Sequence, residues 1–445
     1  MSARQAGRLL VQRRFGPLFA LFQTGTFNDN ALKNALIAMI TFGGVAFLSD
    51  LPSQIRVPVA ALIFTGPFTV LCAIAGQIAD KVDRGVIFRW VKRVEVGVMG
   101  LAALGFYLQD VRILAVALGL MGAQSAFFSP TKNAVLPQWL GERELITGNA
   151  VLSGVQFAVV LGATIVGLQV LKMGAGTLSL VLVALALVGW AMSELCPPAP
   201  APRPDLKINY EPVTATIDVL KTAFAHPEVL RPLLGVAWFY GVSAIFVTTL
   251  PDYVGSTLGF EEGALQILLA ASTVSILLGA VFVMVVGNWR VWGPEAVRLV
   301  ALGSTGVTLA TLALVSIPKP VHAATAPDGA AFGSVAAFLG HPATPLFIGV
   351  LVAASFCNGV FLVPLQAMAQ RRAPPAIRAR LMSAGSVLLN LAVNLATFGL
   401  IALAARALAP ETPFWLIVAG GTGVSAYAIL RSVRLGGRAR PGAME

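Results

Sequence analysis

The sequence predicts an all-α integral membrane protein whose twelve transmembrane helices form two halves of six. Three observations support this prediction. Of the 445 residues, 57% are hydrophobic and only 11% are charged, with a mean hydropathy of +0.82, which is too apolar for a soluble protein. Apolar runs long enough to cross a bilayer recur along the chain. A proline-rich segment at 197–204 divides these runs into two equal sets.

The predicted helices follow one another in order. The first six runs lie near 16–41, 56–78, 86–108, 112–130, 148–170 and 177–195. The second six lie near 231–251, 263–287, 297–317, 344–366, 380–405 and 412–430. Because dense proline favours an extended linker, we predict an N-terminal half at 1–196, a cytoplasmic linker at 197–228 with a short surface helix, and a C-terminal half at 229–445. The segment from Pro318 to Pro345 is predicted to be an outer loop.

The distribution of basic residues predicts the topology. The formal net charge of +11 could indicate nucleic-acid binding. If both termini and the linker lie in the cytoplasm, however, 25 of the 31 Lys and Arg residues fall on that side, five of them in 81–93, and only five lie on the other side. Lys33 lies within the first helix. This split follows the positive-inside rule, so the charge indicates orientation and attraction to anionic lipids, and we expect no nucleic-acid partner.

The first apolar run contains an acidic residue, Asp29, near its middle. An ionisable side chain at bilayer depth costs roughly 2.5 to 3.5 kcal/mol, so it normally faces a cavity or a charged partner. Asn30 and Lys33 belong to a polar stripe on the same helix, at steps of three or four residues. We predict that this stripe lines a substrate cavity. The alternative is an ion pair between Asp29 and Lys33 that only helps the helix to tolerate the membrane.

Three further polar residues are candidate substrate contacts. Lys132 follows Pro130, which bends a helix, and could offer a positive charge to a phosphate, although a lysine near a helix end can equally reach to the water at the membrane surface. Asn390 and Asn394 lie one turn apart in the run at 380–405. Their amides could hold a polar ligand or hydrogen-bond two helices together.

The loop after the second run carries Gly76, Asp80 and Arg84. Glycine allows two helices to approach closely, and the aspartate can cap a neighbouring helix or pair with an arginine. The order of glycine, aspartate and basic residues resembles the cytoplasmic loop signature of the major facilitator superfamily, although Asp83 and Gly85 depart from the usual spacing. Together with the six-plus-six plan, it predicts that fold, with a central site near the bilayer midplane.

Several segments resemble the bacterial lysophospholipid transporter family. The most specific are 27–36, which contains Phe-Asn-Asp-Asn-Ala, and 128–132, which reads Phe-Ser-Pro-Thr-Lys; 148–150, 361–366 and 390–394 are weaker. The likeness spans nearly the whole transmembrane region. It is strongest to transporter halves that occur fused to acyltransferase and acyl-carrier-protein synthetase domains.

The resemblance implies a protein that moves lysophospholipids from the outer to the inner leaflet of the bacterial cytoplasmic membrane. There a separate acyltransferase or acyl-carrier-protein synthetase would reacylate them. It also implies that Asp29 lines the cavity and contributes to head-group recognition. Two positions depart from standalone members of the family: Ile245 stands roughly where they carry an arginine, and Val393 where they carry an acidic residue. The head-group partner in the C-terminal half is therefore not given by the resemblance.

Two other functions fit parts of the sequence. A single membrane carboxylate could carry protons in a proton-coupled small-molecule or drug transporter. An enzyme is the other possibility, but none of the three histidines is followed five residues later by aspartate, as the acyltransferase motif requires. The isolated cysteines and histidines show no ligand spacing either, so we expect neither a metal site, a cofactor nor catalysis.

Lipid transport also predicts an opening to the membrane. An acyl chain loses about 0.8 kcal/mol of burial per methylene in water, so it should stay in an apolar environment throughout transfer. We therefore predict a lateral gap between the halves, near the fifth and eighth or the second and eleventh helices. Thr65, Gly66 and Thr69 are small residues of the second helix that could leave this gap, or could simply allow tight packing.

Overall fold

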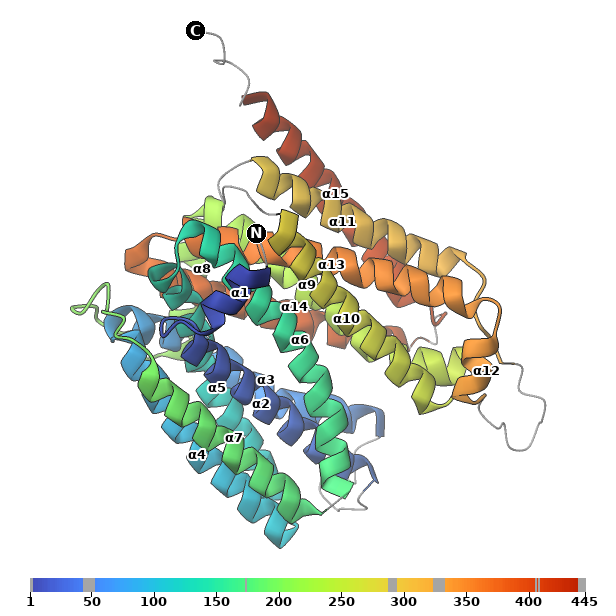
Figure 1. The fold of residues 1–445 in the computed structure, drawn as a ribbon, viewed down its shortest axis with the longest axis horizontal. Helices are drawn as coiled ribbons and strands as arrows, with labels where there is room; N and C mark the ends of the chain where they lie inside the picture. Colours follow the sequence, from blue (N-terminus) through green and yellow to red (C-terminus); the bar gives the residue numbers. More distant parts are fainter. Residues whose placement is uncertain are drawn as a thin grey trace.

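The computed structural model describes residues 3–42, 53–172, 174–286, 294–322, 333–404, 406 and 409–438. In these residues twelve helices are of membrane-spanning length, six on each side of a linker, as predicted (Figure 1). Ten of them are also apolar enough to cross a membrane by composition alone. The other two, α2 and α4, are equally long but carry charged residues within their length. Each of the twelve predicted runs corresponds to one of these helices, with ends that agree to within a few residues at most of them.

The N-terminal half comprises the short α1 and six long helices: α1 (Ala3–Leu10), α2 (Gly16–Phe42), α3 (Ser53–Lys81), α4 (Arg84–Leu108), α5 (Val111–Trp139), α6 (Glu142–Lys172) and α7 (Ala175–Leu195). The linker contains α8 (Pro212–Phe224), which is the surface helix expected near 210–228. The C-terminal half comprises α9 (Pro227–Asp252) with a π-helical turn at Tyr253–Leu258, α10 (Glu262–Val286), α11 (Pro294–Ser316), α12 (Val335–Gly340), α13 (Thr344–Arg372), a 3₁₀ turn at Pro375–Ile377, α14 (Arg378–Ala404) and α15 (Thr412–Arg438).

We had predicted that the segment from Pro318 to Pro345 is a loop. This prediction is only partly correct, because the described part of the segment contains the short helix α12. The hydroxyl of Ser334 caps this helix by accepting a hydrogen bond from the backbone N–H of Ala337 at 3.2 Å. Phe338 is fully buried, and its ring packs edge-on against Phe260, with 5.0 Å between the ring centroids. A single buried aromatic ring and a cap thus stabilise a short helix in a segment without apolar periodicity.

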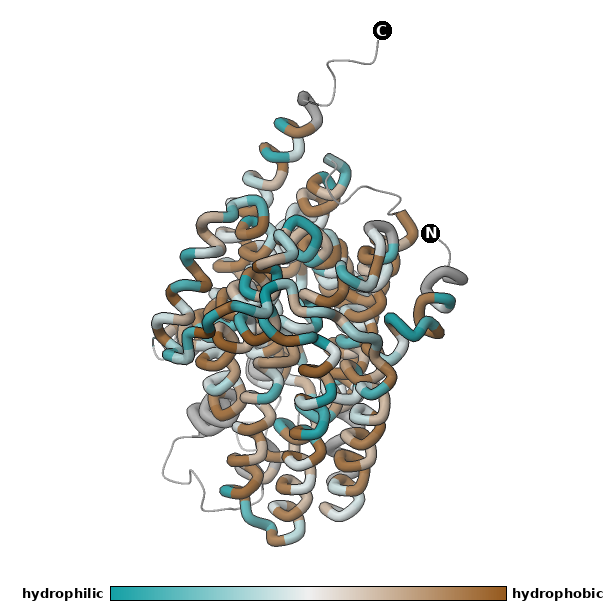
Figure 2. Tube along the Cα trace, turned by 90° about the vertical axis from the view of Figure 1, so that its left-hand side faces the viewer, coloured by the Kyte–Doolittle hydropathy of each residue, from teal (hydrophilic) through white to brown (hydrophobic). Residues whose placement is uncertain are grey.

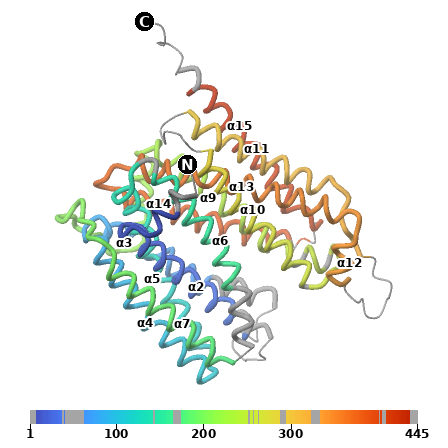
Figure 3. The backbone as a smooth tube through the Cα atoms, viewed as in Figure 1, coloured from blue at the N-terminus to red at the C-terminus, as the bar shows by residue number. Residues whose placement is uncertain are grey.

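The helices meet at one end of the molecule and diverge from it. The linker, α1, α8 and the C-terminal end of α15 lie toward this end, which we call the linker end (Figures 1 and 3). We call the opposite end of the molecule the far end. Toward the far end, α4 and α7 diverge from α12. Figure 2 shows hydrophilic segments crossing the face that carries the linker, over helices that are mostly hydrophobic.

The linker follows the turn between α3 and α4. The backbone N–H of Arg203 donates to the carbonyl of Asp80 at 3.0 Å, and that of Arg84 donates to the carbonyl of Ala199 at 3.0 Å. The Asp83 carboxylate accepts from the N–H of Ala199 at 3.0 Å. These bonds satisfy backbone groups that no regular element would otherwise pair. The extended, proline-rich linker is therefore fixed along the surface of the N-terminal half.

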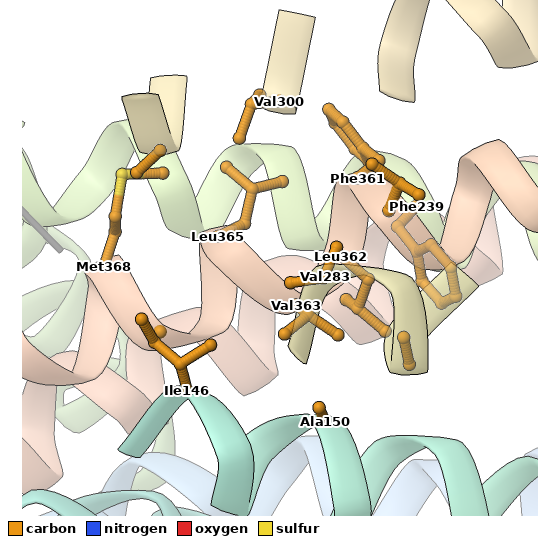
Figure 4. Packing of buried hydrophobic residues seen from close by; sticks show 14 of the residues in the cluster. Ile146, Ala150, Phe239, Val283, Val300, Phe361, Leu362, Val363, Leu365 and Met368 are labelled. Atoms are coloured by element: carbon orange, nitrogen blue, oxygen red, sulfur yellow. The ribbon is translucent and has the colours of Figure 1, made fainter. Parts of the chain in front are cut away.

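An apolar core joins the halves as well as filling them. In Figure 4, Ile146 and Ala150 of α6 face Val363 and its neighbours on α13. The same cluster continues to Phe239 of α9 and Val300 of α11, and its members are at least nine-tenths buried. Within a membrane, close packing of such side chains, rather than their removal from water, holds the helices together. The contact between α6 and α13 positions the two walls of the central cavity.

Candidate functional site

A cavity of about 310 Å³ lies between the two halves. Helices α2, α3, α4, α5 and α6 form one wall, and α9, α13 and α14 form the other. Of the six residues that we singled out as substrate contacts, five line it: Asp29, Asn30, Lys33, Lys132 and Asn390. Asn394, one turn farther along α14, is half-buried and is not among the described residues of the lining.

Asp29 lies in the cavity wall, where Ser125 is its hydrogen-bonding neighbour among the described residues. The hydroxyl of Ser125, on α5, lies 3.3 and 3.4 Å from its two carboxylate oxygens. Lys33 does not form an ion pair with Asp29 but donates from Nζ to Oδ1 of Asn30 at 3.1 Å. Asn30 in turn donates to the carbonyl of Thr26 at 2.9 Å. The alternative interpretation of a self-sufficient Asp29–Lys33 pair therefore does not describe this structure, and the carboxylate stays open to the cavity.

Lys132 faces the cavity from the other side of the N-terminal wall. Its Nζ lies 3.8 Å from the centre of the Phe22 ring, which is within cation–π distance. Among the described ion pairs none includes Lys132. Pro130 stands inside α5, and the hydroxyl of Thr131 bonds to the carbonyl of Phe127 at 2.6 Å, four residues back. The lysine thus presents a charge to the cavity without a carboxylate partner in the described residues.

A second charged pair, on α4, was missed by the sequence analysis. We counted Lys92 among the basic residues of the cytoplasmic side, but the structure buries it, with its side chain 2% exposed beside a Glu95 side chain that is 0% exposed. Their charged atoms lie 2.6 Å apart, and Asn28 donates to the other oxygen of Glu95 at 3.1 Å. Gly25 makes room for this pair, because a Cβ there would lie 2.7 Å from the Lys92 nitrogen. The available signal was opposite charges three residues apart in an apolar run.

The C-terminal wall carries no charged side chain among its described lining residues. Asn390 lines the cavity, and its amide donates to the carbonyl of Ser386 on the same helix at 2.8 Å. Leu233, Val236 and Tyr240 of α9 add apolar and aromatic surface. The wall offers amides, hydroxyls and hydrocarbon in place of ions.

Polar bonds between the halves close the cavity at the linker end. The carboxylate of Asp80 accepts from the backbone N–H groups of Ala379 and Arg380, in the first turn of α14, at 3.0 and 3.3 Å. It also lies 3.5 Å from a guanidinium nitrogen of Arg84. A Cβ on Gly76 would lie 2.5 Å from that of Ser383, so α3 and α14 approach as closely as glycine allows. Asp80 therefore both caps a helix of the opposite half and pairs with an arginine.

Two further contacts across the same region come from amides. Asn149 of α6 and Gln370 of α13 exchange hydrogen bonds of 2.8 and 3.0 Å, side chain to side chain. One helical turn deeper, Ser153 donates to Gln366 at 2.8 Å. All four groups are neutral, so the bonds can be broken and remade without separating charges. The sequence alone does not show which of these residues pair, because the partners lie on different helices.

The comparisons with known proteins agree with this geometry. The sequence pattern of the Major Facilitator Superfamily matches residues 34–327. A lysophospholipid transporter LplT of Enterobacter sp. (strain 638) is 24% identical over 349 residues, covering 78% of this chain and 77% of that protein. A lysophospholipid transporter LplT of Klebsiella pneumoniae (strain 342) is 24% identical over 408 residues, covering 91% of each chain.

Solved structures share the fold. A bacterial homologue of the iron transporter ferroportin, in an outward-facing state, superposes with a TM-score of 0.65 at 16% identity, covering 94% of this chain and 99% of that one. The human organic anion transporter MFSD10 superposes with a TM-score of 0.67 at 13% identity and the same coverage. At such identities the similarity shows a shared fold, so the substrate has to be inferred from the cavity residues.

Proposed function

The chain belongs to the Major Facilitator Superfamily, and on that premise we propose that it transports lysophospholipids from the outer to the inner leaflet of a bacterial cytoplasmic membrane. One observation carries the proposal: the central cavity holds both signs of charge on its N-terminal wall, whereas the described residues of the opposite wall are uncharged and partly apolar. Relatives named lysophospholipid transporters, aligned over most of this chain, support the choice of substrate.

A lysophospholipid fits the two walls in one orientation. Its phosphate would approach Lys132, which has no carboxylate partner among the described residues. An ammonium head group would approach Asp29. Charge-assisted hydrogen bonds of this kind contribute about 1.5 to 3 kcal/mol each. Asn390, from the opposite half, would contact the head group only when the halves are close together.

The single acyl chain would follow the apolar part of the cavity. Phe64 and Phe68 of α3 and Leu233 and Val236 of α9 line this part. Because each methylene exposed to water would cost about 0.8 kcal/mol, these apolar side chains would keep the chain out of water during transfer. The cavity would therefore select an amphipathic molecule over a sugar or an ion.

The topology proposed from the charge distribution places the linker end in the cytoplasm. The cross-half bonds of Asp80 and Gln370 would then close the cavity toward the cytoplasm, leaving the far end as the route of entry. In this scheme residues 1–196 and 229–445 move as two bodies joined by the linker at 197–228. A separate acylating enzyme at the cytoplasmic surface would consume the delivered substrate, and the transporter itself would need no catalytic group.

Of the two predicted positions for the lateral entry, we propose the one between α3 and α14 rather than the one between α6 and α10. A Cβ on Gly154 would lie 2.5 Å from a methyl carbon of Leu277, so α6 and α10 are already in tight contact. On α3, by contrast, a Cβ on Gly66 would have no neighbour within 4 Å. Gly66 lies ten residues from Gly76 and thus about 15 Å nearer the far end. Asn394, outside the cavity lining, would stand along this route.

A vesicle assay tests the proposal directly. The purified chain is reconstituted, fluorescent lysophosphatidylethanolamine is added outside, and its protection from extraction by albumin is followed. We expect Asp29→Asn to slow protection about tenfold or more, from loss of a charge-assisted contact. Asp205→Asn, an exposed carboxylate in the linker, is the matched control. Equal rates in protein-containing and empty vesicles would reject lysophospholipid transport.

The same assay separates the rival function and the gate. A proton-coupled small-molecule or drug transporter would leave lysolipid protection at the rate of empty vesicles, and the uptake of its own substrate would collapse with the proton gradient. For the gate, Gly66→Trp should block transfer, whereas Gly97→Trp, at an exposed glycine of α4 that also has open space around it, should not. Normal transfer by Gly66→Trp would exclude entry between α3 and α14 while leaving the substrate proposal standing.

A further inference from the structure

A second cavity, of about 480 Å³, lies at the linker end of the C-terminal half. It is enclosed by α9, α11, α13 and α15, and none of its lining residues lines the central cavity. Its volume falls within the range of roughly 300 to 1,000 Å³ that is typical of ligand sites. The proposed transport route does not use it.

The floor of this cavity is hydrocarbon. Val300, Phe361, Leu365 and Met368 are all at least nine-tenths buried, and they come from α11 and α13. Figure 4 shows Phe361, Leu365 and Met368 along α13, with Val300 facing them. The mouth is less enclosed: Leu234 is 47% exposed and Tyr427 is 51% exposed. The slot therefore runs from the outer surface of the helix bundle into its apolar core.

The mouth of the slot is basic. Its charged lining residues are Arg231 on α9, Arg372 at the end of α13, Arg431 on α15 and the single acid Glu228. Arg372 lies within electrostatic range of the other two arginines, which repel it, and of Glu228, which attracts it. Three like charges are thus held near one another beside an apolar slot. Such an arrangement is stabilised by an anion that bridges them.

The walls of the slot leave room for a hydrocarbon chain. A Cβ on Gly423 of α15 would meet nothing within 4 Å, although this residue lines the cavity. Gly420, one turn earlier on the same helix, is in the opposite situation, because a Cβ there would lie 2.4 Å from the Trp238 ring. The open space is therefore local to the slot and is not a general looseness of α15.

We propose that this cavity binds an anionic phospholipid of the surrounding leaflet, with the phosphate between Arg231, Arg372 and Arg431 and one acyl chain in the slot. Guanidinium groups match the geometry of phosphate oxygens, and basic pockets between transmembrane helices bind anionic head groups. The net charge of the mouth favours an anionic lipid over a zwitterionic one, whose ammonium the arginines would repel. The bound lipid would tie α9, α13 and α15 together at the linker end.

Thermal stability of the full chain tests the proposal without any transport measurement. The delipidated protein in neutral detergent is titrated with dioleoyl phosphatidylglycerol or dioleoyl phosphatidylcholine, and Tm is recorded. We expect Tm to rise by several degrees with phosphatidylglycerol and little with phosphatidylcholine. In Arg231→Gln/Arg431→Gln the apparent affinity for phosphatidylglycerol should fall about tenfold or more. Arg434→Gln, an exposed arginine on the same helix, should leave it unchanged.

Filling the slot is the second, independent arm. Gly423→Phe places a ring where the acyl chain would lie and keeps every charge, so it should also abolish the shift; Gly97→Phe is the matched control. Equal shifts with both lipids would overturn the proposal, as would an unchanged response to phosphatidylglycerol in either Arg231→Gln/Arg431→Gln or Gly423→Phe. A shift produced equally by glycerol 3-phosphate would identify the site as one for a free anion and not for a lipid. None of these outcomes depends on whether lysophospholipid is transported.

Discussion

The two walls of the central cavity differ in chemistry although both are built from transmembrane helices. The N-terminal wall contains five ionisable residues: Asp29, Lys33, Lys92, Glu95 and Lys132. The described lining residues of the C-terminal wall carry amides, hydroxyls and hydrocarbon. Its polar residues are Tyr240, Gln366, Gln370, Ser386 and Asn390. The halves therefore do not contribute equally to recognition.

The difference assigns a task to each half. Charges are costly in a membrane, so a wall that retains them uses them. Lys92 and Glu95 compensate each other within the N-terminal half, whereas Asp29 and Lys132 have no oppositely charged partner within ion-pair distance among the described residues. Of the three described amide side chains that line the C-terminal wall, Gln366 and Gln370 bond across to the N-terminal half. One half thus recognises charge, and the other forms bonds that can open and close.

The largest expected effect comes from breaking the compensated pair. Lys92→Met leaves the fully buried carboxylate of Glu95 without its ion-pair partner, which should cost about 3 to 5 kcal/mol of the free energy of unfolding. The double variant Lys92→Met/Glu95→Met should recover most of this loss, because two apolar side chains can replace a buried pair. Equilibrium unfolding in mixed micelles measures the free energy of unfolding of the single and the double variant.

Arg93 provides the control for this prediction. It lies next to Lys92 on α4 and forms an exposed ion pair with Glu194 at 2.9 Å. Arg93→Gln should change the unfolding free energy by at most about 1 kcal/mol, as exposed pairs do. If the two single variants, Lys92→Met and Arg93→Gln, were equally destabilised, the Lys92–Glu95 pair would not be the buried anchor that the N-terminal wall requires.

The second prediction compares the two walls in transport. Lys132→Met removes a charge and should lower the rate of lysophospholipid transfer at limiting substrate by about 10- to 100-fold, the equivalent of roughly 1.5 to 3 kcal/mol. Asn390→Leu removes only a neutral amide and should lower it about 2- to 10-fold. Initial rates of albumin protection measure both. A larger loss at Asn390 than at Lys132 would reverse the assignment of recognition to the N-terminal half.

The third prediction concerns the bonds across the linker end. Asn149→Ala leaves the buried amide of Gln370 without its reciprocal partner and should destabilise the closed linker end by about 1 to 3 kcal/mol. The accessibility of Cys72 measures the opening of the linker end, because Cys72 is fully buried between α3 and α14. Ser383 donates to its backbone carbonyl there at 2.6 Å. In a background without the other two cysteines, maleimide labelling of Cys72 should become about 5- to 100-fold faster.

Two comparisons make the labelling experiment specific. Thr397→Ala removes a hydroxyl that bonds only to the backbone of its own helix, at the carbonyl of Val393, and should leave labelling unchanged. Replacing Gln370 by Leu in addition to Asn149→Ala should slow labelling again, because neither amide is then left unsatisfied. Labelling that does not respond to Asn149→Ala would mean that these amides hold the helices together without controlling access.

The fold could be predicted from the sequence because membrane burial leaves few alternatives. A run of about 20 apolar residues must be helical, since every backbone group needs an internal partner in lipid. Twelve such runs and a proline-rich break were sufficient to give the helix count and the position of α8. The short helix α12 was missed because a cap at Ser334 and one buried ring at Phe338 have no periodic signature.

The site was only partly predictable. Periodicity along one helix could place Asp29, Asn30 and Lys33 together, since local spacing determines which side chains share a face. It could not show that Lys33 bonds to Asn30 and leaves Asp29 open. Contacts between halves were beyond reach for another reason: Asn149 and Gln370 are 221 residues apart, and pairing at that separation depends on how the helices pack. Lys92 was assigned to the surface because a lysine near a helix end is usually solvated.

The smallest expected effect lies in the linker, which belongs to neither wall. Glu211 caps α8, and its carboxylate accepts hydrogen bonds from the backbone N–H groups of Val213 and Thr214. Hydrogen bonding from Thr214, and then from Val213, lowers the pKa of Glu211 below its ordinary value of 4.5. Because the folded-state pKa is lowered, the cap contributes fully above pH 4.5 and is lost as the pH falls through the lowered pKa.

Hydrogen exchange of α8 amides measures this cap. At neutral pH, Glu211→Ala should speed exchange in the first turn of α8 and leave α9 unchanged, and the difference from the unsubstituted chain should shrink when the folded protein is compared below pH 4.5. The control is Thr222→Ala, which removes a hydroxyl that donates to the carbonyl of Asp218 within the same helix. A difference that persisted undiminished at low pH would mean that the Glu211 charge does not hold the helix start. The linker would then rely on the packing of Ala215 and Val219, which are fully buried, and would couple the two halves through apolar contact alone.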